Sequence, residues 1–133
     1  MLRISTKSQY GLRAMVYLAC SPDKISPLKL ISKKERIPFD YLEKIILELE
    51  KAGLIKSKKG SRGGYFLTKN PKKIKVYQII RTLEKEKNLV KCLSKNYRCP
   101  LVKKCLTKDF WQKIQRSLEK TLNSITLADL VKK

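Results

Sequence analysis

The stretch PFDYLEKIILELEKAGLIKSKKGSRGGYFL, residues 38–67, decides the fold of this chain. Its first half predicts a helix with one buried face, because apolar residues recur there at helical spacing. These residues are Leu42, Ile45, Ile46 and Leu49. Gly53 marks the end of the helix, since glycine adopts the left-handed conformation that often terminates one.

The second half of the stretch predicts a β-hairpin with a basic, glycine-rich turn. Leu54-Ile55 predicts one strand and Tyr65-Phe66-Leu67 its partner. The intervening residues 56–64, KSKKGSRGG, include three glycines, which permit positive φ at the tip and close approach to a phosphate backbone. A nucleotide-binding loop is the alternative, but the P-loop and dinucleotide-binding spacings are both absent.

Another helix is expected just upstream. Ser26-Pro27 predicts its start, with serine as N-cap and proline at the first helical position, and its end is expected near Arg36. Two short helices joined by a tight turn form a helix-turn-helix, and a basic hairpin after them is the layout of a winged helix.

The first helix is predicted from about Thr6 to Cys20 and is apolar on nearly every side. Such a helix is buried on more than one side, and a dimer partner is a plausible second cover. We expect Cys20, at its end, to be a small buried side chain.

Downstream of the hairpin, a fourth helix is expected to end near Glu84, followed by a loop and a long C-terminal helix. The predicted division is a winged-helix domain at 1–84, a cysteine-containing loop at 85–105, and a dimerisation helix with C-terminal tail at 106–133. The expected fold class is therefore mainly α with a small β-hairpin wing: a winged helix-turn-helix plus a long C-terminal dimerisation helix.

Composition points to a polyanionic partner. The 133 residues include 32 Lys or Arg and 11 Asp or Glu, for a formal net charge of +21, and 42% are hydrophobic, enough for a core. A charge this large favours DNA or RNA as partner, although a lysine-rich thermophilic surface would also explain it. No apolar run approaches the roughly 18 residues that span a bilayer, and the N-terminus lacks a secretory apolar region, so we expect a cytoplasmic protein without a membrane partner.

Three cysteines lie close together in a basic stretch, in a protein with no histidine. They are Cys92, Cys99 and Cys105. Clustered thiols in the cytoplasm indicate a soft-metal or redox centre rather than structural disulfides. With no histidine and no convincing acid–base pair, we expect the protein not to be an enzyme.

Five residues are expected to contact DNA. Tyr41 and Lys44 lie on the helix expected to enter the major groove, which carries the base code. Arg62 and Lys59 belong to the wing, and Arg62 suits a narrow minor groove. Lys58 is expected to contact phosphate, which supplies affinity without sequence specificity.

The order of these elements resembles the IscR/NsrR family of bacterial winged-helix regulators, over almost the whole chain. The strongest matches are KGSRGGY at 59–65, YLEKII at 41–46 and ITLADL at 125–130. CPLVKKC at 99–105 is similar to the nitric-oxide-sensing NsrR branch. The resemblance implies a transcriptional regulator, for which repressor is the expected class although an activator is also compatible with the sequence. Because the first and last helices have more apolar surface than a small winged helix covers, we expect a homodimer that binds an inverted-repeat operator in double-stranded DNA.

The resemblance also implies a cofactor. In family members with three such cysteines, the thiolates hold an iron–sulfur cluster, [2Fe-2S] or [4Fe-4S], through which the regulator senses redox state, nitric oxide or iron–sulfur status. The fourth ligand departs from the family pattern: Lys108 stands where IscR-like proteins have histidine, and Gln9 where NsrR-like proteins have an aspartate from the partner protomer. Gln9 of the second protomer and the nearby Asp109 are the candidates.

Three alternatives remain open. Structural zinc usually takes four ligands, and this stretch offers three cysteines. A regulator without a cluster can sense oxidants through a cysteine thiol switch, since disulfide formation needs no metal. A basic DNA-binding protein without any sensing function would explain the charge but not the cysteines.

Overall fold

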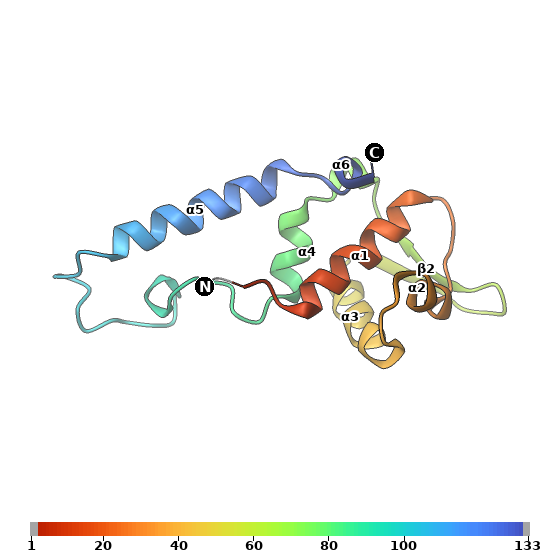
Figure 1. Cartoon of the computed structure of the whole chain (residues 1–133), viewed down its shortest axis with the longest axis horizontal. Coiled ribbons are helices and arrows are strands. Elements are labelled where there is room, and N and C mark those ends of the chain that lie inside the picture. The colour runs from red at the N-terminus through yellow and green to blue at the C-terminus, as the bar shows by residue number, and fades with distance from the viewer. Residues whose placement is uncertain (1–2, 132–133) are drawn as a thin grey trace.

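The computed structural model describes residues 3–131; residues 1–2 and 132–133, the ends of two predicted divisions, lie outside the described residues. The chain folds into a mostly helical body with a hairpin at one end and a long helix extending from the other (Figure 1). In chain order the elements are α1 (Thr6–Cys20), α2 (Leu28–Glu35), α3 (Phe39–Lys51), β1 (Ile55–Lys58), β2 (Gly64–Leu67), η1 (Pro71–Lys73), α4 (Val76–Leu83), η2 (Lys91–Leu93), α5 (Lys108–Ser124) and α6 (Leu127–Val131). None of the helices within this described range is long and apolar enough to cross a membrane.

The predicted winged helix is confirmed. Helices α2 and α3 form the helix-turn-helix, and β1 and β2 pair antiparallel, with a register from Ile55 opposite Leu67 to Lys58 opposite Gly64. The turn between the two helices contains Arg36, whose φ of 54° is left-handed. The mainly helical fold class with a two-stranded wing therefore agrees with the prediction from the sequence.

Ser26 has a different role from the predicted one. The N-cap of α2 is Pro27, whose carbonyl accepts the first helical hydrogen bonds. Ser26 instead exchanges two backbone hydrogen bonds with Tyr65, at 2.9 and 2.8 Å. This isolated bridge places the start of the helix-turn-helix against the wing, a long-range pairing that the Ser-Pro motif does not encode.

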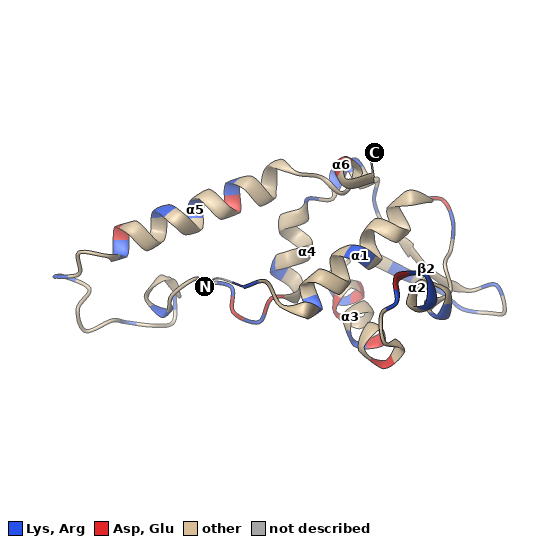
Figure 2. Ribbon diagram, in the orientation of Figure 1, with Lys and Arg blue, Asp and Glu red and all other residues tan. Residues whose placement is uncertain are grey.

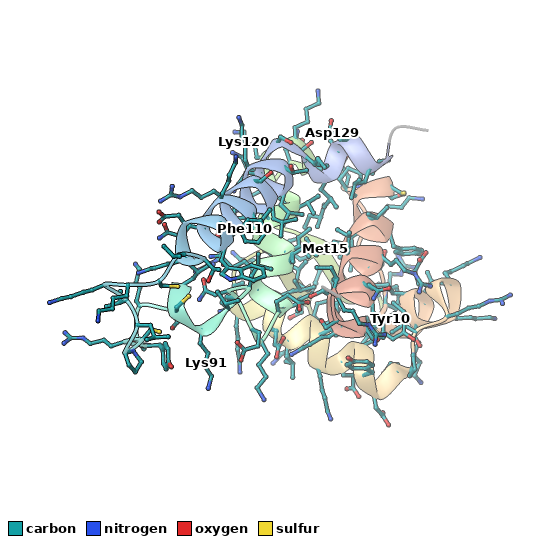
Figure 3. The ribbon with its side chains drawn as sticks, turned by 60° about the vertical axis from the view of Figure 1, so that its left-hand side comes forward. Tyr10, Met15, Lys91, Phe110, Lys120 and Asp129 are labelled. Atoms are coloured by element: carbon teal, nitrogen blue, oxygen red, sulfur yellow. The ribbon has the colours of Figure 1, made fainter. Side chains whose placement is uncertain are left out.

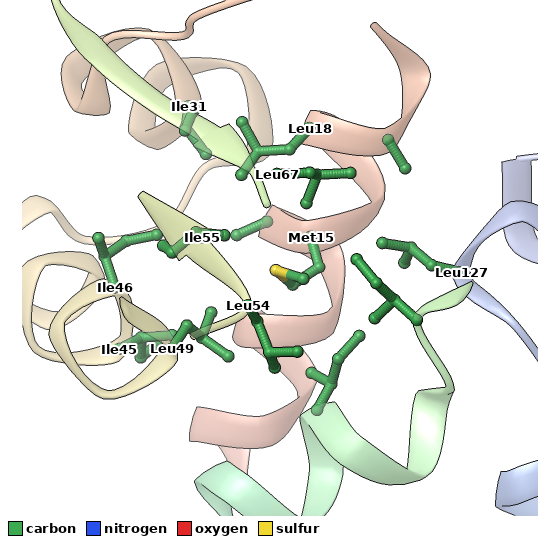
Figure 4. Close-up of a cluster of buried hydrophobic side chains, with 14 of the residues drawn as sticks. Met15, Leu18, Ile31, Ile45, Ile46, Leu49, Leu54, Ile55, Leu67 and Leu127 are labelled. Atoms are coloured by element: carbon green, nitrogen blue, oxygen red, sulfur yellow. The ribbon is translucent and has the colours of Figure 1, made fainter. Parts of the chain in front are cut away.

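The core lies where α1 crosses α3, α4 and the base of the wing (Figure 4). Met15 of α1 is fully buried at its centre. The apolar stripe predicted for α3 is also fully buried: Leu42, Ile45, Ile46 and Leu49. At roughly 25 cal/mol per Å² of buried apolar surface, this packing is the main stabilising contribution to the fold.

Gly11 allows the closest approach in this core. A Cβ atom at position 11 would lie 2.1 Å from Cδ1 of Leu83 in α4 and 3.3 Å from Cγ2 of Ile45 in α3. The first distance is far below van der Waals contact, so a methyl group at position 11 would require the Leu83 side chain, or α4 with it, to shift.

The C-terminal end of α1 and the segment after α5 differ in burial. Cys20 is exposed, not buried as predicted, because it is the last residue of α1, just before the chain turns at Ser21. After α5, the chain returns to the body, where Leu127 of α6 is fully buried in the core. The C-terminal tail thus anchors the far end of α5 to the winged-helix body.

Replacing Gly11 with alanine should test this crossing. We expect Gly11→Ala to lower the free energy of unfolding by about 1–2 kcal/mol, because the overlap of the added methyl with Leu83 outweighs the roughly 1 kcal/mol that alanine gains over glycine inside a helix. Gln9→Ala, an exposed change in the same helix, should stay within about 0.5 kcal/mol of the wild type. Urea denaturation monitored by circular dichroism measures both. Equal stability of Gly11→Ala and wild type would show that α1 and α4 are less tightly packed than described.

Candidate DNA interface and cysteine segment

The outer face of α3 is the surface expected to enter DNA. Opposite its buried stripe, α3 exposes Asp40, Glu43, Lys44 and Leu47. Lys44, one of the predicted base-contacting residues, is free to reach a groove from this face. The two carboxylates beside it can accept a hydrogen bond from a cytosine amino group and repel phosphates, so this face is suited to discrimination more than to affinity.

Tyr41 occupies a less open position than Lys44. Its ring meets Tyr10 of α1 edge to face, with centroids 5.6 Å apart, and the side chain is half-buried. The guanidinium of Arg13 lies over the other tyrosine ring, 5.6 Å from its centroid. Tyr41 thus joins α3 to α1, and its remaining exposed edge is what it can present to DNA.

The wing presents the other predicted residues to solvent. Lys58 ends β1, and Lys59 and Arg62 lie in the turn; all three are exposed. The predicted positive φ at the tip occurs at Gly60, where φ is 116°. An arginine on so narrow a turn has the shape needed for entry into a minor groove.

Contacts at its base hold the wing against α3. The hydroxyl of Ser57 donates to the carboxylate of Glu50 at 3.1 Å. Burial raises the pKa of Tyr65 in β2, and the nearby carboxylates of Glu50 and Glu43 raise it further. These contacts orient wing and helix together, so that one DNA duplex can meet both.

The charge distribution favours a nucleic-acid interface at this end of the molecule. No Asp or Glu occurs between Glu50 and Glu84, a stretch with ten Lys or Arg that includes the whole wing. Figure 2 shows basic residues on α2 beside the wing as well. Sequence reasoning missed these α2 side chains, Lys29 and Lys33, although their spacing of four residues already placed them on one exposed helix face. They are additional candidates for phosphate contacts.

The three cysteines lie at the other end of the molecule, in the cysteine segment (residues 85–105). Cys92 lies in the short helix η2, and Cys99 accepts a hydrogen bond from the backbone N–H of Leu101 at 3.4 Å. Side chains of this segment and of α5 are shown in Figure 3, where Lys91 and Phe110 mark the two elements. From residue 87 to residue 108 the chain has seven Lys or Arg and no Asp or Glu. This surplus of cations offsets the charge of thiolates held there.

Cys105 lies just before α5. Its Sγ is 3.4 Å from the hydroxyl oxygen of Thr107. Hydrogen bonds from the Thr107 side chain and backbone lower the pKa of the Cys105 thiol, and the Lys108 backbone and charge contribute in the same direction. These contacts favour the thiolate form of Cys105.

The cysteine segment does not contain an assembled metal site. Among residues 3–131, no three His, Cys, Asp or Glu side chains are close enough together to hold a metal ion. Both candidates for a fourth ligand are exposed: Gln9 donates to the carbonyl of Ile4 at 3.0 Å, and Asp109 lies in the first turn of α5. The donor chemistry of three thiols fits a thiolate-ligated cluster, but the segment must fold around it for the ligands to converge.

Helix α5 is only partly covered by the rest of the chain. None of its 17 residues is buried, and Phe110 and Leu118 are 53% and 44% exposed. A cavity of about 440 Å³ separates α5 from α4, with Ile80 on one wall and Leu122 on the other. Gln115 links α5 to the cysteine segment by accepting from the backbone N–H of Leu89 at 3.0 Å. So much unburied apolar surface on one helix is typical of an interface.

Comparison with known proteins identifies relatives over the full length of the chain. The model of the Rrf2 family, described as an iron-dependent transcriptional regulator, matches residues 4–133. The chain is 35% identical to Protein rrf2 of Nitratidesulfovibrio vulgaris over 133 residues, which cover 98% of this chain and 88% of the relative.

Two solved structures are similar as well. IscR of T. potens has a TM-score of 0.79 and 40% identity, with 98% of this chain and 87% of that chain covered. CymR of B. subtilis, described as the global cysteine regulator, has a TM-score of 0.80 and 35% identity, and the match covers 98% of this chain and 97% of that chain. The predicted similarity to IscR is therefore confirmed, and a second regulator, named for cysteine, is equally similar in fold.

Two wing substitutions should separate the types of DNA contact. We expect Arg62→Ala to lower affinity and to change base preference, because the turn brings this side chain into a groove. Lys58→Ala should weaken binding to all sequences alike and reduce the salt slope by about one, because it removes a phosphate contact. Fluorescence anisotropy with duplexes selected by the wild type, over a range of salt concentrations, measures both. A change of preference in Lys58→Ala but not in Arg62→Ala would contradict these assignments.

Proposed function

The chain belongs to the Rrf2 family of transcriptional regulators, and we propose that it is a homodimeric regulator whose binding to an inverted-repeat operator depends on the state of the cysteine segment. DNA-binding transcriptional regulation follows from family membership, and the relatives are regulators rather than enzymes. What is proposed beyond this is the dimer, the symmetry of the operator and the means of sensing.

The dimer is supported by α5. A helix of 17 residues with none buried leaves more apolar surface than one winged-helix body covers. Because most soluble oligomers are two-fold symmetric, a second copy packed along α5 would place two wings in corresponding positions on DNA. Two-fold symmetry of the protein then calls for an inverted repeat in the operator.

Sensing is supported by one observation above all, the concentration of three thiols in residues 87–108, a stretch with seven Lys or Arg and no Asp or Glu. Cys92, Cys99 and Cys105 would hold an iron–sulfur cluster, whose iron–thiolate bonds supply the sensitivity to oxidants or nitric oxide. The residues of this chain bind and orient the thiolates: Gln115 ties the segment to α5, and the surrounding lysines balance the negative charge. Gln9 of the second protomer or Asp109 would complete the ligand set.

A second function is favoured by a different observation. Cys105 has a lowered pKa, and CymR, described as a cysteine regulator, is as similar in fold as IscR. A thiol switch within the same segment, in which two cysteines are oxidised to a disulfide, would give a regulator that needs no cluster.

The oligomeric state tests the first part of the proposal. We expect a single dimeric species in sedimentation equilibrium at micromolar concentration, because the apolar face of α5 is otherwise exposed to water. Replacing Leu118 with lysine should shift the population to monomer and weaken operator binding. A wild-type monomer, or equal affinity for one half-site and for the inverted repeat, would exclude the symmetric dimer.

Single-cysteine variants test the sensing centre. In anaerobically purified protein we expect Cys92→Ser, Cys99→Ser and Cys105→Ser each to lose iron, acid-labile sulfide and the associated visible absorption. Cys20→Ser is the matched control and should keep the iron, the sulfide and the visible absorption, because Cys20 is the last residue of α1 and lies outside the cysteine segment. Full cluster content in any of the three segment variants would refute the three-cysteine site. A wild type without iron that loses operator binding reversibly on oxidation would favour the thiol switch.

A further inference from the structure

A carboxylate ties the first turn of α1 to the start of the cysteine segment. Glu84 Oε2 accepts hydrogen bonds from the backbone N–H of Ser5 at 3.2 Å and from the Ser5 hydroxyl at 2.6 Å. It also accepts from the hydroxyl of Ser8, which is fully buried. Three donors from α1 and its N-cap thus converge on a single oxygen, and hydrogen bonds to a charged acceptor are the strong kind.

Glu84 lies at the junction between α4 and the cysteine segment. Glu84 is the C-cap of α4, its backbone N–H donates to the carbonyl of Ile80 at 2.8 Å, and the cysteine segment begins at the next residue. Burial alone would raise the pKa of Glu84, but the hydrogen bonds from Ser5 and Ser8 outweigh it and hold the pKa below its ordinary value. The carboxylate is therefore ionised and bonded whenever the protein is folded near neutral pH.

The same turn of α1 is also bound to the DNA-reading helix. Lys7 Nζ donates to Glu48 Oε1 of α3 at 2.5 Å, and the second carboxylate oxygen of Glu48 is buried and has no hydrogen-bond partner among residues 3–131. Loss of Lys7 from this position would leave a carboxylate partly buried and uncompensated, which is costly. The ion pair of Lys7 with Glu48 therefore connects the first turn of α1 directly to α3.

We infer that Glu84 is a positioning residue for DNA binding, which couples the cysteine segment to α3 through Ser5, Ser8 and Lys7 of α1. The inference rests on the proposed function for its biological meaning, because it supplies the route by which the state of the cysteines reaches the DNA-reading surface. When the segment rearranges around its thiols, Glu84 moves with it, and the first turn of α1 carries the displacement to Glu48. A helix is suited to this task because it moves as a rigid unit.

The competing explanation is that Glu84 only stabilises the junction between α1 and α4. In that case its removal lowers stability but leaves the operator affinity of the folded protein unchanged, or changes it independently of Lys7. A double-mutant cycle separates the two explanations, because only coupled residues give non-additive effects.

The test measures operator affinity for the wild type, Glu84→Gln, Lys7→Met and the double variant, with a duplex selected from a random-sequence pool by the wild type. We expect the two single changes to be non-additive by at least about threefold in affinity. Glu86→Gln is the matched control: it makes the same change of charge two residues later, at an exposed side chain, and should combine additively with Lys7→Met. Hydrogen exchange should also increase in α3, but not in the wing, on Glu84→Gln substitution.

Additive effects, or unchanged exchange in α3, would overturn the inference. Should Glu84→Gln fold poorly, Ser5→Ala replaces it in the cycle, since it removes one hydroxyl donor and leaves the other two donors in place. The proposed function is tested separately, by comparing operator affinity of the anaerobically purified wild type with that of the triple Cys92→Ser, Cys99→Ser, Cys105→Ser variant. Equal affinities there would refute sensing, whereas the cycle would still decide whether Glu84 acts on α3.

Discussion

The close crossing of α1 over α4 and α3 at Gly11 is the constraint on which the rest of the structure depends. Because no side chain separates the helices there, Leu83 and Ile45 meet the backbone of α1 directly. Polar contacts from the same helix then fix its neighbours: Lys7 binds α3 and Arg13 binds the carbonyl and carboxylate of Glu35 at the end of α2. The helix-turn-helix is held in place by α1 at both of its helices.

This arrangement separates two surfaces that have different chemistry. The wing and α2 are basic and suited to phosphate contacts, whereas the exposed face of α3 carries Asp40 and Glu43 beside Lys44. A net charge of +21 attracts any DNA, and carboxylates on α3 would oppose such non-specific binding. If α3 and the wing contact DNA as proposed, α3 would supply discrimination and the wing affinity.

The cysteine segment and α5 share a different property, which is that neither is completed within one chain. The thiols lie on one segment without forming a metal site among the described residues, and α5 has no buried residue. In the proposed dimer, a second copy covers α5, and its Gln9 is a candidate ligand for the cysteines. Cluster binding and ordering of the cysteine segment would then occur together, and part of the free energy of cluster ligation would be used to fold that segment.

The winged helix could be predicted from the sequence, because periodicity reports which face of each element is buried: the stripe of α3, the bounds of α1 and the glycine at the wing tip followed from it. The surroundings of Ser26, Cys20 and Tyr41 could not be predicted in this way, because they depend on how the elements pack. Ser26 pairs with Tyr65 far along the chain, Cys20 is exposed by the turn after α1, and Tyr41 packs on Tyr10. Local patterns specify how a residue faces its own helix or strand, but not which distant element it meets. The convergence of Ser5 and Ser8 on Glu84 depends on contacts 76 and 79 residues apart, which no local pattern encodes.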